Sequence, residues 1–184
     1  MADKNKIRKL TDPVLILEKL EISQGFNVAD FGCGAGYYTL PLAKLVGGPG
    51  KVFAIDILES SLESVKSKTE IEGFLNVETI RANLENAKGS GLKANSIDLV
   101  LMANLLYQAE KRLDIFKEAK RVLKKAGKLA VIEWNPDVKE KPLGPNYKIK
   151  FNKETILKEA ENEGFKFEKE IEIDEYRYGF LFCK

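Results

Sequence analysis

A glycine-rich segment between a short apolar run and a helical stretch constrains the fold of this chain more than any other feature. Residues 27–31 have strand character, and Gly32, Gly34 and Gly36 follow them before a helical pattern over residues 37–46. Glycine has no Cβ atom, so it tolerates positive φ angles and lets a ligand come close to the backbone. A strand, a glycine turn and a helix N-terminus together predict a cradle for a nucleotide-sized ligand.

The rest of the chain alternates between strand and helix patterns. After a helix that begins at Asp12-Pro13, the patterns predict strands over residues 27–31, 51–57, 77–82, 97–103, 128–134, 165–173 and 176–183, and helices over residues 37–46, 58–72, 111–125 and 153–163. Such alternation is typical of an α/β fold with a parallel sheet and helices on both faces. Only Asp174-Glu175 separates the last two strands, so we expect these two to pair as an antiparallel hairpin.

Length and composition narrow the class of protein. The 184 residues suit one domain over residues 1–184, in which residues 1–11 form a flexible basic arm. We expect a cytoplasmic protein, because no signal peptide or membrane span is recognisable. Thirty basic and 28 acidic residues give a net charge of +2, so we expect no DNA partner, while the arm leaves RNA open. With no histidine and two cysteines, no metal site is expected. The oligomeric state stays undetermined.

The glycine spacing distinguishes between nucleotide ligands. A dinucleotide fingerprint, GxGxxG, would place its third glycine where this chain has Tyr37, whereas here it comes one residue earlier, at Gly36. GxGxG with an acid, Asp30, two residues upstream is typical of S-adenosylmethionine (SAM) binding in class I methyltransferases. Asp56 ends the second predicted strand, where a carboxylate can accept hydrogen bonds from both ribose hydroxyls of an adenosine. NAD would use the same acid, so Asp56 predicts an adenosine without separating the two cofactors.

Three further side chains are candidates for the adenine ring. Asn83 follows the third predicted strand, where its amide could bind the adenine edge or simply form a turn. Leu84 and Ile57 could enclose the ring between them.

Seven segments of the chain resemble one known family. Over residues 28–43, 50–56, 96–104, 118–124, 127–134, 144–145 and 176–182, the sequence is similar to class I SAM-dependent methyltransferases, in particular to small prokaryotic proteins near the ubiquinone/menaquinone-biosynthesis methyltransferases. The resemblance extends from about residue 13 onward. It implies a Rossmann-like, seven-stranded sheet in the order 3-2-1-4-5-7-6, with strand 7 antiparallel. It also implies SAM as the cofactor and S-adenosylhomocysteine as its product.

The resemblance assigns roles to individual positions. Asp56 would bind the ribose, Asn83 and Leu84 the adenine, and Asn104 would lie beside the methionyl part of SAM. The methionine end would lie against Gly32 and its neighbours, which are Asp30, Cys33, Gly34 and Gly36. The chain departs from its relatives on the acceptor side, where Tyr107-Gln108 stands in place of a frequent histidine, and Gly144-Pro145-Asn146 in place of Gly-Pro-Pro.

These observations favour a transferase that moves the methyl group of SAM to a small-molecule acceptor by in-line displacement. The predicted cradle holds no lysine or arginine, which suits a cationic sulfonium. In the absence of histidine, the candidates for taking a proton from the acceptor are Tyr107, Glu133 and Tyr147. The alternatives are an NAD-dependent oxidoreductase, disfavoured by the glycine spacing and the lack of a separate substrate domain, and a non-catalytic SAM-binding or RNA-associated protein, disfavoured by the balanced charge.

Overall fold

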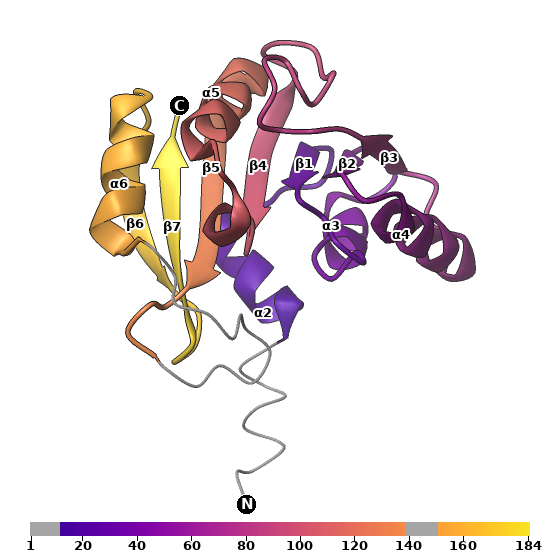
Figure 1. Ribbon diagram of the computed structural model, residues 1–184. Helices are drawn as coiled ribbons and strands as arrows, with labels where there is room; N and C mark the ends of the chain where they lie inside the picture. The colour runs from indigo at the N-terminus through magenta and orange to yellow at the C-terminus, as the bar shows by residue number, and fades with distance from the viewer. Residues whose placement is uncertain (1–11, 139–150) are drawn as a thin grey trace, which may run out of the picture.

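A seven-stranded sheet forms the centre of the computed structural model, which describes residues 12–138 and 151–184 (Figure 1). The strands lie in the order β3-β2-β1-β4-β5-β7-β6. Their bounds are β1 Asn27–Phe31, β2 Lys51–Asp56, β3 Val77–Arg81, β4 Ile97–Ala103, β5 Leu123–Trp134, β6 Lys166–Glu172 and β7 Arg177–Cys183. Neighbours among β1 to β5 pair in parallel, whereas β7 is antiparallel to both β5 and β6. The α/β fold class and the strand order are therefore confirmed.

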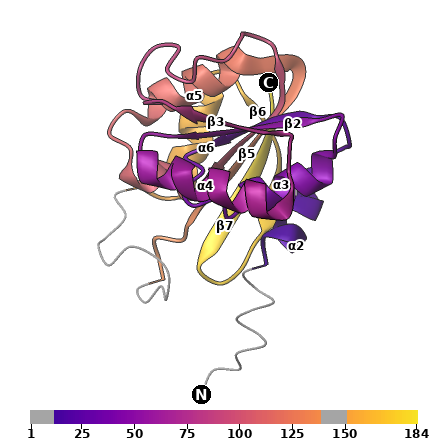
Figure 2. The same ribbon diagram turned by 90° about the vertical axis from the view of Figure 1, so that its right-hand side faces the viewer.

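Helices cover both faces of this sheet, which Figure 2 shows edge-on. One layer contains α2 (Pro13–Leu17), the short 3₁₀ helix η1 (Glu18–Leu20), α3 (Thr39–Val46) and α4 (Glu59–Glu72), and the other contains α5 (Arg112–Val122) and α6 (Lys153–Asn162). Successive strand residues point to opposite faces, so Val28 packs with Leu17 and Leu42 of the first layer. Phe31 packs instead with Phe116 of the second layer. Within the described residues, no helix is both long and apolar enough to cross a membrane. The basic arm expected over residues 1–11 lies outside the described residues.

The junction between α5 and β5 differs from the prediction. The helix expected to continue to residue 125 ends at Val122, and β5 begins at Leu123. Leu123 adopts extended dihedral angles (φ −63°, ψ 140°), is fully buried and pairs with Ile97 of β4. Burial of Leu123 within the sheet thus outweighs the helix propensity of the lysines that follow it.

The antiparallel direction of β7 decides which residues reach the carboxyl ends of the parallel strands. β7 begins at that edge of the sheet, where its first residue, Arg177, pairs with Trp134, the last residue of β5. The turn between β6 and β7, which contains Asp174, lies at the same edge. The predicted hairpin is confirmed, and it brings the C-terminal part of the chain to the end of the sheet where α/β folds bind ligands.

Candidate functional site

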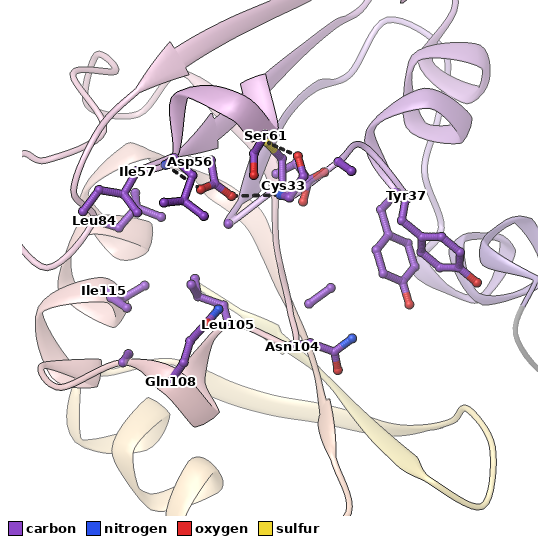
Figure 3. Close-up of a pocket in the computed structure, with 18 of the residues that line it drawn as sticks. Cys33, Tyr37, Asp56, Ile57, Ser61, Leu84, Asn104, Leu105, Gln108 and Ile115 are labelled. Atoms are coloured by element: carbon purple, nitrogen blue, oxygen red, sulfur yellow. Dashed lines mark hydrogen bonds between the residues drawn. The ribbon is translucent and has the colours of Figure 1, made fainter. Parts of the chain in front are cut away.

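A pocket of about 970 Å³ opens at the carboxyl ends of the parallel strands (Figure 3). Its volume lies at the upper end of the range typical of small-molecule sites. The lining residues come from the segments that follow β1, β2, β3 and β4, from the end of β5, from α5, and from the β6–β7 turn with the start of β7. The strand order reverses between β1 and β4, which is the position where open α/β sheets form their ligand crevice.

The glycine turn forms one wall of this pocket. Gly32, Gly34 and Gly36 have φ angles of +73°, +51° and +88°, which explains why glycine stands at each position. Gly32 and Gly34 line the pocket, and a Cβ atom at Gly32 would lie 2.8 Å from Cδ1 of Leu105. Gly36 is not among the lining residues; a Cβ atom there would lie 2.7 Å from Cδ1 of Leu40. Gly36 therefore permits close packing beneath the turn.

Asp56 joins the end of β2 to the glycine turn. Its Oδ2 accepts a hydrogen bond from the backbone N–H of Gly34 at 2.9 Å, and its Oδ1 accepts one from Leu58 N–H, also at 2.9 Å. Each carboxylate oxygen has two acceptor directions, so both can still accept from a ligand hydroxyl. Asp56 lines the pocket, and the two backbone bonds fix the orientation of its carboxylate there.

Apolar side chains line one side of the pocket, where Figure 3 shows Ile57 next to Leu84 and Ile115 further along the same side. Leu84 is buried, whereas Ile57 leaves 54% of its surface exposed. Asn83 also lines the pocket, and its Oδ1 accepts a hydrogen bond from Glu85 N–H at 2.9 Å. The amide oxygen of Asn83 thus forms the turn that the sequence left open as an alternative.

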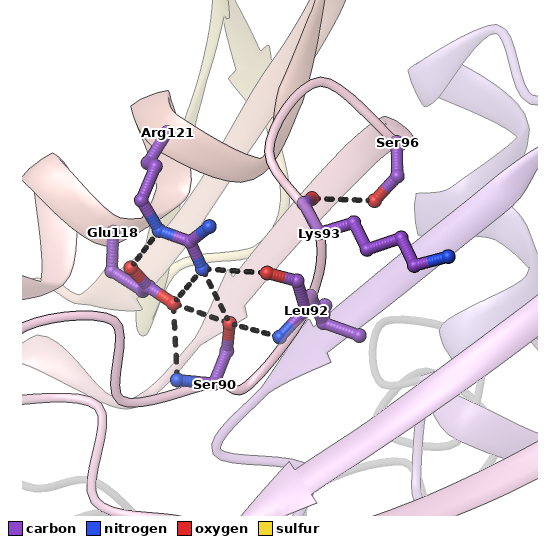
Figure 4. A network of polar contacts seen from close by, with 6 residues as sticks. All are labelled: Ser90, Leu92, Lys93, Ser96, Glu118 and Arg121. Atoms are coloured by element: carbon purple, nitrogen blue, oxygen red, sulfur yellow. Dashed lines mark hydrogen bonds and ion pairs between the residues drawn. The ribbon is translucent and has the colours of Figure 1, made fainter.

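A buried polar network holds the loop after β3 against α5 (Figure 4). Glu118 is only 3% exposed, and it accepts hydrogen bonds from the backbone N–H of Ser90 at 3.0 Å and from the Ser90 hydroxyl. Arg121 donates to Glu118 from Nε and Nη2, each at 2.7 Å, and to the carbonyl oxygen of Leu92 at 2.8 Å. Although burial raises the pKa of Glu118, the bonds from Arg121 and Ser90 lower it to a net value below normal. The network positions the loop that carries pocket residues 82–85.

Asn104 follows β4 and lies at the opposite end of the pocket from the apolar group (Figure 3). Its φ angle is +53°, and its N–H donates to the carbonyl oxygen of Ile132 at 2.8 Å. Its Oδ1 is buried and has no hydrogen-bond partner among the described residues. A buried acceptor without a donor is costly, so this atom suits a ligand that brings an N–H or ammonium group.

Asp30 lies beneath the glycine turn and is 1% exposed. Burial raises the pKa of Asp30 to about 7; the hydrogen bond from the Thr39 hydroxyl, 2.6 Å long, opposes this shift, and the charge of Asp56 adds to it. Because Asp30 lines the pocket, a cationic ligand would stabilise its ionised form.

Of the three candidate proton acceptors, the two that lie in the described part of the chain, Glu133 and Tyr107, do not line the pocket. Glu133 is fully buried and is not among the residues that line the pocket; its carboxylate accepts from the N–H groups of Tyr107 (3.1 Å) and Trp134 (2.9 Å). Burial raises its pKa to about 7 against the effect of these bonds. Glu133 thereby holds the 3₁₀ helix η2 (Leu106–Gln108) in place. Tyr107 does not line the pocket either, although its neighbour Gln108 does, and Tyr147 lies outside the described residues.

Sequence reasoning missed the far wall of the pocket, which is built from distant segments. Arg177 is 7% exposed and donates to Oδ2 of Asp174 from Nε at 2.9 Å and from Nη2 at 2.6 Å. Its Nη1 donates to the hydroxyl of Tyr38 at 3.2 Å, and its guanidinium carbon lies 5.9 Å from the centre of the Trp134 ring. No local motif indicates this grouping; the only signal in the sequence was that these residues lie at or next to the ends of predicted elements.

Carboxylates dominate the charge of the pocket. Among the described lining residues, Arg177 is the one cationic side chain, whereas five carry carboxylates: Asp30, Asp56, Glu85, Glu110 and Asp174. Such a pocket favours a cationic ligand and disfavours a pyrophosphate.

The Rossmann-like sheet, the glycine turn fixed to an acid at the end of β2, and the carboxylate-rich pocket together define a class I methyltransferase type of domain. In agreement, residues 22–174 match the family described as "Methyltransferase domain", and the chain belongs to this family. The resemblance seen in the sequence is thereby confirmed.

Individual relatives agree with this assignment. The chain is 33% identical over 127 residues to a demethylmenaquinone methyltransferase of Lactococcus lactis, an alignment that covers 69% of this chain and 47% of the relative. A demethylmenaquinone methyltransferase of Geobacillus stearothermophilus is 29% identical over 64% of this chain and 49% of its own length. The chain therefore spans about half the length of these curated relatives.

Solved structures show the same fold over the full chain. A SAM-dependent methyltransferase from Aquifex aeolicus superimposes with a TM-score of 0.84 and 29% identity, covering 100% of this chain and 99% of the other. The [4+2]-cyclase SpnF superimposes with a TM-score of 0.79 at 16% identity, over 96% of this chain and 80% of SpnF, which shows a shared fold alone.

Proposed function

We propose that this chain is a single methyltransferase domain that transfers the methyl group of SAM to a small-molecule acceptor and leaves S-adenosylhomocysteine. The observation that carries the proposal is the attachment of the Asp56 carboxylate to the glycine turn through Gly34 N–H, inside a pocket rich in carboxylates. A pyrophosphate-containing cofactor such as NAD would meet the same carboxylates unfavourably.

In this proposal, each end of the pocket binds one part of the cofactor. Ile57 and Leu84 enclose the adenine ring, and Asp56 accepts from the ribose hydroxyls. The orphaned Oδ1 of Asn104 accepts from the ammonium group of the methionyl part, which lies along the glycine turn at Gly32.

The chemistry needs little from the protein beyond orientation. SAM supplies a methyl group already activated by a sulfonium, and the acceptor lone pair forms the new bond while sulfur keeps the electrons of the broken C–S bond. The pocket walls align the two reactants and exclude water, which is the main contribution expected of the protein in such a displacement. The apolar group around Ile115 and the covering side chain of Leu105 provide much of that exclusion.

In this proposal, the acceptor binds at the side of the pocket that carries the aromatic side chains Tyr37, Trp134 and Tyr176. The names of the curated relatives point to a quinone-type ring as the acceptor in those proteins. Flat apolar side chains in the present chain are compatible with a planar ring of that kind.

The cofactor assignment is tested by Asp56→Ala. Removal of a charged hydrogen-bond acceptor is expected to weaken binding of S-adenosylhomocysteine by roughly 1.5–3 kcal/mol, measured by isothermal titration calorimetry.

The matched control is Asp98→Ala. Asp98 also accepts from a backbone N–H, that of Asn27 at 2.9 Å, but it does not line the pocket. This variant is expected to lose stability and to keep its affinity for S-adenosylhomocysteine. Unchanged affinity in Asp56→Ala, or saturable binding of NAD by the wild type in place of SAM, would contradict the proposal.

A further inference from the structure

Arg177 stands at the opposite side of the pocket from Asp56. Asp56 ends β2, whereas Arg177 begins β7, and β1, β4 and β5 lie between these two strands. With neighbouring strands roughly 4.8 Å apart, β2 and β7 are separated by about 19 Å. A ligand group at Arg177 is therefore remote from an adenosine held at Asp56, on the side of the pocket left for the acceptor.

The guanidinium of Arg177 has unused donors that are buried. Of its five N–H groups, one on Nε and one on Nη2 donate to Asp174, and one on Nη1 donates to Tyr38. The remaining N–H groups on Nη1 and Nη2 have no acceptor among the described residues, although the side chain is only 6% exposed. Buried donors of a charged group are costly when unpaired, so their position at a pocket wall indicates a ligand oxygen.

Asp174 forms an ion pair with Arg177, and this pairing lets the unused N–H donors of Arg177 lie in the same pocket as a cationic cofactor. Asp174 has a side chain that is 1% exposed, and it balances the charge of the guanidinium within the wall itself. Its Oδ1 accepts from Tyr176 N–H at 2.8 Å, so the carboxylate is held on both sides. The ion pair thus presents directed N–H groups without placing a net positive charge beside a sulfonium.

The surroundings of Arg177 define the rest of the ligand. The Trp134 ring lies 5.9 Å from the guanidinium carbon, and Tyr38 and Tyr176 line the same wall. Aromatic rings bury large flat surfaces and pack favourably against another ring. The wall therefore combines aromatic surface with the charge-assisted donors of a guanidinium, which can bind a carboxylate oxygen.

We propose that Arg177 determines acceptor specificity by binding a carboxylate carried by a planar aromatic methyl acceptor. The inference rests on the proposed function, because it assigns the acceptor side of the same pocket. Carboxylates of two origins could reach the guanidinium, that of the acceptor and that of the methionyl part of SAM, and the inference assigns Arg177 to the acceptor.

Two probes that share a ring and differ in charge test the inference. Protein saturated with S-adenosylhomocysteine is titrated with 2-naphthoate and with 2-naphthol by calorimetry at neutral pH. We expect the wild type to bind 2-naphthoate at least about tenfold more tightly, and Arg177→Gln to lose this preference while its affinity for S-adenosylhomocysteine changes less than about threefold.

A second variant distinguishes the loss of ligand binding from the loss of folding. Arg177→Gln leaves the buried Asp174 without a counter-charge, which is strongly destabilising, whereas the double variant Asp174→Asn/Arg177→Gln leaves a neutral pair. Both are expected to lose the preference for 2-naphthoate. The control is Arg112→Gln, since Arg112 forms a partly buried ion pair with Glu159 at 2.6 Å and does not line the pocket.

Three other results overturn the inference, and a fourth refutes the proposed function. Equal binding of the two probes by the wild type, or a preference that survives in both Arg177 variants, overturns the inference. An affinity for S-adenosylhomocysteine that falls tenfold or more in Arg177→Gln also overturns it, because the guanidinium then binds the carboxylate of the cofactor. Failure of the wild type to bind S-adenosylhomocysteine at all refutes the proposed function, and this result is distinct from the others.

Discussion

The two sides of the pocket are built in different ways. The side that we propose for the cofactor, formed by the glycine turn and Asp56, uses two consecutive strand–turn units, and its key contact joins residues 22 positions apart. The side that we propose for the acceptor joins Tyr38 and Arg177, which are 139 positions apart, through a side-chain hydrogen bond. The first arrangement depends on backbone geometry, and the second depends on how β5, β7 and α3 meet.

This difference bears on specificity. Backbone N–H groups and glycine φ angles at Gly32 and Gly34 are tied to the fold itself, so the cofactor side can stay constant while the acceptor changes. The acceptor side consists of side chains such as Trp134 and Arg177, which substitution can alter without changing the sheet. Function in such folds is decided by sites placed on a common framework.

The largest effect is expected from Glu133→Gln, which changes the buried support of η2 behind the acceptor side and leaves the cofactor side as it is. Burial raises the pKa of Glu133 to about 7 from its ordinary value of 4.5, so between these pH values the unfolded chain releases a proton that the folded chain keeps. Stability therefore falls as pH rises through this window, by roughly 3 kcal/mol from this group.

Urea unfolding at a series of pH values checks this prediction. In Glu133→Gln the decline in the free energy of unfolding is expected to be smaller by about that amount, whereas the exposed control Glu172→Gln retains the full decline. An unaltered pH profile in Glu133→Gln would show that the buried carboxylate titrates as it does in the unfolded chain.

A somewhat smaller effect is expected on the cofactor side from Gly32→Ala. The φ angle of +73° strains alanine, and its Cβ atom would lie 2.8 Å from Cδ1 of Leu105, so the turn must shift where the ligand approaches. Binding of S-adenosylhomocysteine is expected to weaken about a hundredfold by calorimetry.

Gly73→Ala is the matched control for this strain. Gly73 has the same φ angle of +73°, offers open space within 4 Å of the place where a Cβ atom would stand, and does not line the pocket. It is expected to lose roughly 1–2 kcal/mol of stability, the strain of a left-handed residue, with no loss of affinity. Equal affinity losses in the two variants would assign the effect of Gly32→Ala to general destabilisation.

The smallest effect concerns Asp30. Its pKa, raised to about 7 by burial, means that its carboxylate becomes ionised between about pH 6 and pH 8, and the ionised form attracts a sulfonium. The affinity for SAM is expected to rise by up to about tenfold over this range, while that for S-adenosylhomocysteine, which lacks the sulfonium charge, stays nearly constant. Asp30→Asn is expected to remove the pH dependence, and parallel profiles for the two ligands in the wild type would contradict the prediction.

Much of the framework followed from local patterns. The strands and helices that the alternation predicted are present, and the positive φ angles of the glycine turn match the residues that stand there. The prediction that the helix continues to residue 125 was wrong, because Leu123 pairs with the distant Ile97 and begins β5. The proton-acceptor candidates were chosen by chemistry alone, and the structure places Glu133 behind the pocket as a support for η2.

Residue order alone is enough to foresee the cradle of Gly32, Gly34 and Asp56, because glycine conformation and strand ends are local properties and adjacent parallel strands end at one edge. The wall of Tyr38, Trp134 and Arg177 has no local cause. It exists because β7 runs antiparallel and pairs Arg177 with Trp134. The start of α3 lies beside this pair, so that Tyr38 can accept a hydrogen bond from Arg177. Side chains from three separate parts of the chain become neighbours only when the whole sheet is assembled.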